Sequence, residues 1–105
     1  MTDNQAKTSA DVDTLVGQAW SKHYHGENDS AIQAFQELVG KWPEHIDANY
    51  GLSLSLKAAG QKQAASEAFK KTKALVDAAR ATQGDENARY TMLSRMIEQQ
   101  LSSLL

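Results

Sequence analysis

The sequence predicts an all-α protein made of antiparallel helix-turn-helix repeats. Apolar residues recur at three- and four-residue intervals, and no stretch shows the strict alternation of a strand. The sequence also aligns with itself at an offset of about 34 residues. Glycines separate the apolar stretches, where turns are needed. We therefore expect five helices stacked as a short right-handed superhelix, an α-α solenoid.

Seven residues recur unchanged at this offset, whereas ordinary residue frequencies would give about two. The recurring pairs are Asp13 and Asp47, Gly17 and Gly51, Ser21 and Ser55, Gly26 and Gly60, Ala31 and Ala65, Ala34 and Ala68, and Phe35 and Phe69. One hairpin cannot bury its apolar face alone, so the two units are expected to stack.

The first repeat is expected at about residues 12–45. Its first helix carries an apolar stripe that includes Val16 and Trp20, and Gly26 ends this helix. Its second helix carries Phe35, and Pro43 closes the unit because a proline forces the preceding residue away from helical angles.

The second repeat is expected at about residues 46–79, with Gly60 at its turn. Asp77 stands where Pro43 stood, so its second helix is expected to continue to about Thr82 and to stop before Gly84. A capping helix is expected at about residues 85–104. Residues 11–105 then form one domain, preceded by a disordered tail at residues 1–10, which lack apolar periodicity.

Composition excludes several classes of function. The chain has no cysteine, and its polar start does not resemble a secretory signal. No apolar run approaches the roughly 20 residues that span a bilayer, so a cytoplasmic protein without membrane insertion is expected. The net charge of −2 disfavours nucleic-acid binding. The charge is uneven: residues 1–52 hold three Lys against eight Asp or Glu, and residues 53–105 hold eight Lys or Arg against five Asp or Glu.

The repeat resembles the tetratricopeptide repeat. The family's small residue, turn glycine, alanine, aromatic and closing proline fall on Ala19, Gly26, Ala31, Phe35 and Pro43. In the second unit they fall on Ser53, Gly60, Ala65 and Phe69, and the proline is missing. The sequence departs from the family where Gln18 replaces an expected leucine, and where the tyrosine before the turn is shifted to Tyr24.

The resemblance implies a protein-interaction module, an adaptor or scaffold, whose first helices line a concave groove for a peptide or helix of a partner protein. Carried onto this sequence, the groove positions are Asp13, Val16, Trp20, His23, Tyr24, Asp47, Tyr50, Leu54 and Lys57. A subset of the family grips a terminal carboxylate with basic groups, and Val16, Trp20 and Gly51 disfavour that role here. The alternative for Trp20, Tyr24 and Tyr50 is packing within the chain.

Catalysis and metal binding have weak support. His23, His25 and Glu27 are clustered, but histidines two residues apart on a helix point to opposite sides. No nucleophile motif or phosphate-binding glycine loop is present. We therefore expect neither an enzyme nor a metal or other cofactor.

The C-terminal helix suggests an alternative function. Its stripe of Leu93, Met96, Ile97, Leu101 and Leu104 either covers the second hairpin or forms a homo-oligomer contact. In the second case the chain is a self-associating structural subunit of a larger complex.

Overall fold

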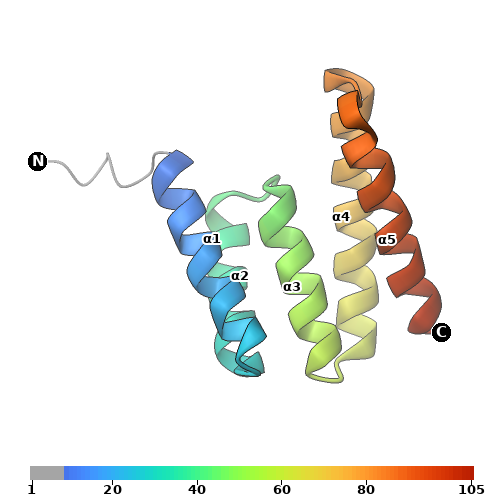
Figure 1. The fold of residues 1–105 in the computed structure, drawn as a ribbon. Coiled ribbons are helices and arrows are strands. Elements are labelled where there is room, and N and C mark those ends of the chain that lie inside the picture. Colours follow the sequence, from blue (N-terminus) through green and yellow to red (C-terminus); the bar gives the residue numbers. More distant parts are fainter. Residues whose placement is uncertain (1–8) are drawn as a thin grey trace, which may run out of the picture.

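The computed structural model describes residues 9–105, and the side chains of residues 11–105. This part of the chain contains no strand and consists of helices that follow one another in antiparallel pairs (Figure 1). The elements are α1 (Ser9–Tyr24), α2 (Asn28–Lys41), α3 (Ile46–Ala58), α4 (Lys62–Gln83), the short 3₁₀ turn η2 (Glu86–Ala88) and α5 (Arg89–Ser103). The predicted all-α repeat fold with five helices is confirmed. The expected disordered tail lies outside the described residues up to residue 8, and α1 begins at Ser9, within the range predicted for that tail.

The two repeat turns have the same backbone geometry. Gly26 and Gly60 adopt φ angles of 75° and 80°, which glycine reaches without steric cost. In the first turn the N–H of Glu27 donates to the carbonyl of Lys22 at 2.9 Å, and the corresponding bond of the second turn measures 3.0 Å. This is the Schellman closure of a helix end. The repeat seen in the sequence is therefore also a repeat of hydrogen bonds.

Two apolar clusters form the core, and each is built around one of the repeated phenylalanines. Phe35 and Phe69 are both completely buried. Phe35 lies against α3 so closely that a Cβ atom built on Gly51 would be 2.2 Å from the ring Cζ. At Gly17, the corresponding position on α1, such an atom would meet nothing within 4 Å.

The helix α4 runs past the end of the repeat. It ends at Gln83, directly before Gly84, as the sequence predicted. Lys41 ends α2, and its counterpart in the second repeat is Leu75, so α4 continues for about two further turns. Figure 1 shows the end of α4 and the start of α5 projecting beyond α3.

Candidate interaction surface

Aromatic side chains from α1 and α3 form a ladder that leads from the core to the surface. Trp20 lies edge-on to Phe35, with ring centres 5.4 Å apart, and its other neighbours include Tyr50 at 6.3 Å. Tyr24 stacks on Trp20 at 5.7 Å with an angle of 26° between the rings. Tyr50 lies edge-on to Phe69, with ring centres 6.2 Å apart. Trp20 and Tyr50 are half-buried and Tyr24 is 75% exposed. The ladder is therefore a partly exposed aromatic surface that packs on the buried Phe35 and Phe69.

His23 joins α1 to α3. Its Nδ1 lies 3.4 Å from Oγ of Ser55, and its ring lies edge-on to Trp20 at 5.7 Å. His25 is used differently, since its Nδ1 donates to the carbonyl of Ser21 at 2.6 Å. The two histidines therefore have separate partners. Among the side chains that the structure describes, no three His, Cys, Asp or Glu form a group that could hold a metal ion.

Lys57 bridges α3 to α5. Its Nζ donates to Oε1 of Gln100 at 2.5 Å and to Oγ of Ser103 at 2.8 Å. Leu54, one turn earlier on α3, is half-buried and packs in the second core cluster. The side of α3 that faces α5 is therefore closed at its C-terminal end.

At the opposite end of α3, the space between α3 and α5 is open. A cavity of about 410 Å³ lies there, lined by Glu44, His45, Ile46, Asp47, Tyr50, Arg89, Tyr90 and Leu93. A second cavity of about 270 Å³ shares Glu44, Ile46 and Tyr90 with it and extends along α4 past Leu75, Ala78, Ala79, Thr82 and Gln83. We call the two cavities together the Tyr90 hollow.

The rim of the Tyr90 hollow carries charges of both signs. Glu44 and Asp47 are exposed at the start of α3. On the α5 side, the guanidinium of Arg89 lies 5.9 Å from the centre of the Tyr90 ring. The Tyr90 hydroxyl donates to Oε1 of Gln83 at 3.2 Å. The Tyr50 phenol is uncharged at neutral pH, and burial raises its pKa further from the ordinary 10.0.

Comparison with known proteins identifies the first hairpin, since residues 13–45 match the family model of the tetratricopeptide repeat. The match covers about a third of the chain, and the five helices of the described residues are consistent with a protein of the tetratricopeptide repeat type. The second hairpin repeats the same turn geometry and the same buried phenylalanine. No curated protein and no solved structure matches the chain. Within residues 9–105, no helix is both long and apolar enough to cross a membrane.

The remaining positions carried over from the tetratricopeptide repeat family lie in different surroundings. Asp13 is exposed on α1, whereas Val16 is only 4% exposed and packs in the first core cluster. Tyr24, Trp20 and Tyr50 form the ladder, and Asp47 and Tyr50 line the Tyr90 hollow. The expected positions therefore lie partly in the aromatic ladder on α1 and α3 and partly along the hollow between α3 and α5.

The apolar stripe on α5 is mostly used within the chain. Ile97 is completely buried, and Leu93, Leu101 and Leu104 are half-buried against the second core cluster. On the outer face of α5, Met96 is 45% exposed and Met92 is 60% exposed. Contact with another copy through α5 would therefore rest on these two methionines.

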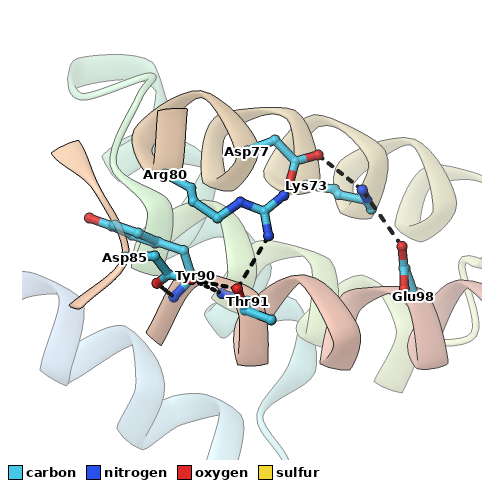
Figure 2. A network of polar contacts seen from close by, with 7 residues as sticks. All are labelled: Lys73, Asp77, Arg80, Asp85, Tyr90, Thr91 and Glu98. Atoms are coloured by element: carbon cyan, nitrogen blue, oxygen red, sulfur yellow. Dashed lines mark hydrogen bonds and ion pairs between the residues drawn. The ribbon is translucent and has the colours of Figure 1, made fainter. Parts of the chain in front are cut away.

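A polar network fixes the start of α5 beside the Tyr90 hollow (Figure 2). Asp85 accepts from the backbone N–H of Tyr90 at 2.8 Å, and from the N–H of Thr91 at 3.1 Å and its hydroxyl. The hydrogen bond from the Thr91 hydroxyl and the two from backbone N–H groups lower the pKa of the Asp85 carboxyl. Arg80 on α4 donates to Thr91 Oγ1 at 3.3 Å. The network positions Tyr90 and, with it, one wall of the hollow.

The same network continues along α4. Lys73 pairs with Asp77 at 2.9 Å and with Glu98 on α5 at 3.7 Å, and Arg80 lies 3.4 Å from Asp77. The hydrogen bond that Lys73 Nζ donates to the Asp77 carboxylate is the main reason that the pKa of Lys73 is raised. These groups are partly exposed, so each pair contributes orientation more than stability.

Sequence reasoning missed Glu44, Arg89 and Tyr90 as parts of a site. The family pattern assigns groove positions to the first helices of the repeats, whereas Glu44 precedes α3 and the other two begin α5. The available signal was the missing proline at Asp77, which predicted a long α4. It did not predict that the extra turns of α4 would hold α5 away from the start of α3.

Proposed function

We propose that this chain is a protein-interaction module that binds a peptide segment of a partner protein over the aromatic ladder and the adjoining side of α3. Tetratricopeptide repeats are generally protein-interaction modules. The observation that carries the proposal is Tyr24, which is 75% exposed although it stacks on Trp20. Aromatic side chains held rigid at a surface supply large contact area at low entropic cost, as in interaction hot spots.

The geometry favours a short epitope. Tyr24, Trp20 and Tyr50 lie within a run of ring contacts no longer than 6.3 Å each, and Phe35 and Phe69 support them from below. Trp20 and Tyr50 are half-buried against these phenylalanines, so a partner that packs on them gains contact without first ordering their side chains.

The test uses the exposed end of the ladder, because its truncation should leave the fold intact. We expect Tyr24→Ala to reduce capture of the partner from a lysate of the native organism, and Trp20→Ala to abolish it. The matched control is Met92→Ala, which also removes a mostly exposed apolar side chain. Circular dichroism must show native helix content for each variant. Unchanged capture by both folded ladder variants would refute the proposal.

A further inference from the structure

The Tyr90 hollow exists because the two repeats end differently. In the first unit the chain leaves the helix at Lys41, and Pro43 follows. In the second unit α4 continues to Gln83, so α5 starts well beyond the start of α3. The space left between these ends is lined by side chains from the turn before α3, from α4 and from α5.

The walls of the hollow are suited to an apolar occupant. Its inner surface is formed by Ile46, Tyr50, Leu75, Tyr90 and Leu93, all of them half-buried. Among the described residues, no buried side-chain nitrogen or oxygen lacks a hydrogen-bond partner. A polar ligand would therefore have no unpaired buried group to bond with. An apolar side chain would bury apolar surface of both the partner and the hollow.

The charged residues at the rim of the hollow favour one sign of charge on the partner, next to that apolar side chain. Glu44 and Asp47 are exposed, and neither forms an ion pair with another described residue. Arg89 is the one cation among the lining residues, and it lies over the Tyr90 ring. The rim thus has two carboxylates, Glu44 and Asp47, against the one guanidinium of Arg89. Complementary charge of this kind sets specificity and the rate of association.

We infer that the Tyr90 hollow receives a large apolar side chain of a partner peptide, with a lysine or arginine next to it that pairs with Glu44 and Asp47. This inference rests on the proposed function and gives it a second contact, separate from the aromatic ladder. The apolar anchor enters between Tyr50 and Tyr90, and the neighbouring basic group stays at the rim.

The experiment is an NMR titration of the full chain with three synthetic peptides of equal length. One carries an apolar anchor beside lysine, one has glutamate in place of that lysine, and one has alanine in place of the anchor. We expect the apolar-basic peptide to bind more tightly than the other two and to shift the amide signals of Ile46, Tyr90 and Leu93. Glu44→Lys with Asp47→Lys should weaken this binding about tenfold or more and should favour the glutamate peptide.

The control variant Asp29→Lys with Glu67→Lys makes the same charge change at exposed sites outside the hollow, and should bind like the original chain. Equal binding of the three peptides would overturn the inference, as would a failure of all three to shift any signal. Shifts confined to Trp20 and Tyr24 would overturn it while supporting the proposed function. Concentration-dependent shifts of the hollow without peptide would assign it to a second copy of the chain and would also overturn it.

Discussion

The first helices of the two repeats, α1 and α3, share a register but face different surroundings. On α3, the residues Ala48, Gly51 and Ser55 are buried, and Gly51 lies against Phe35 of α2. Their counterparts on α1, one repeat earlier, are all exposed. The neighbouring leucines of α3, at positions 52 and 56, are replaced on α1 by a glutamine and a lysine.

This difference shows how a repeat adapts to its place in the stack. Among the described elements α1 packs only against α2 and α3, and a helix face that no neighbour covers needs polar side chains. Gln18 and Lys22 supply that polarity, whereas Gly17 keeps the glycine of the internal repeat although nothing packs on it. The second difference is at the far end of each hairpin, where Pro43 closes the first and Asp77 lets the second continue.

The largest effect is expected when the first repeat's proline is placed in the second. Asp77→Pro should lower the free energy of unfolding by about 3 kcal/mol, because proline in a helix interior removes a hydrogen bond and clashes with the preceding turn. Asp77→Ala is the control, since it removes the ion pairs with Lys73 and Arg80 and should cost less than about 1 kcal/mol. Urea unfolding followed by circular dichroism measures both. Equal losses would mean that α4 accommodates a proline as readily as the turn after α2 does.

The next largest effect is a difference in stability change between the two glycines at corresponding positions of α1 and α3. Gly51→Ala should lower the free energy of unfolding by about 1–3 kcal/mol, because its Cβ would meet the Phe35 ring at 2.2 Å. Gly17→Ala should raise it by up to about 1 kcal/mol, because the methyl meets nothing and alanine favours the helix. Thermal and urea unfolding of both variants provide the comparison. Changes of the same sign would contradict the difference in packing between α1 and α3.

Most of the fold could be predicted from the sequence, but less of the candidate site could. The offset between the repeats, the turn glycines and Phe35 with Phe69 predicted the hairpins because each of these features acts locally or between adjacent units. The missing proline also predicted that α4 continues, and Gly84 predicted where it ends. The Tyr90 hollow depends on where α5 docks along α4, and that is set by contacts such as Asp85 with Tyr90 and Thr91, which no periodicity encodes.

The turn between α4 and α5 gives the smallest predicted effect and contrasts with the repeat turns. The turns at Gly26 and Gly60 are closed by the same pair of backbone hydrogen bonds. The turn between α4 and α5 instead places Asn87 and Ala88 at φ angles of 66° and 55° and holds the start of α5 with the Asp85 carboxylate. We expect Asp85→Asn to lower stability at neutral pH, since an amide cannot accept from three donors as the carboxylate does. Glu86→Gln removes the adjacent exposed carboxylate and is the control.

The pH dependence distinguishes this effect from a change in packing. Because the pKa of Asp85 is lowered in the folded chain from the ordinary 3.8, the ionised carboxyl adds stability at pH values above 3.8. That contribution is lost as the pH falls through the lowered pKa, where the folded state must also take up the proton. Urea midpoints measured from neutral to acidic pH should therefore converge for the original chain and Asp85→Asn. A gap that stays constant down to the lowest pH would show that Asp85 acts through its shape and not through its charge.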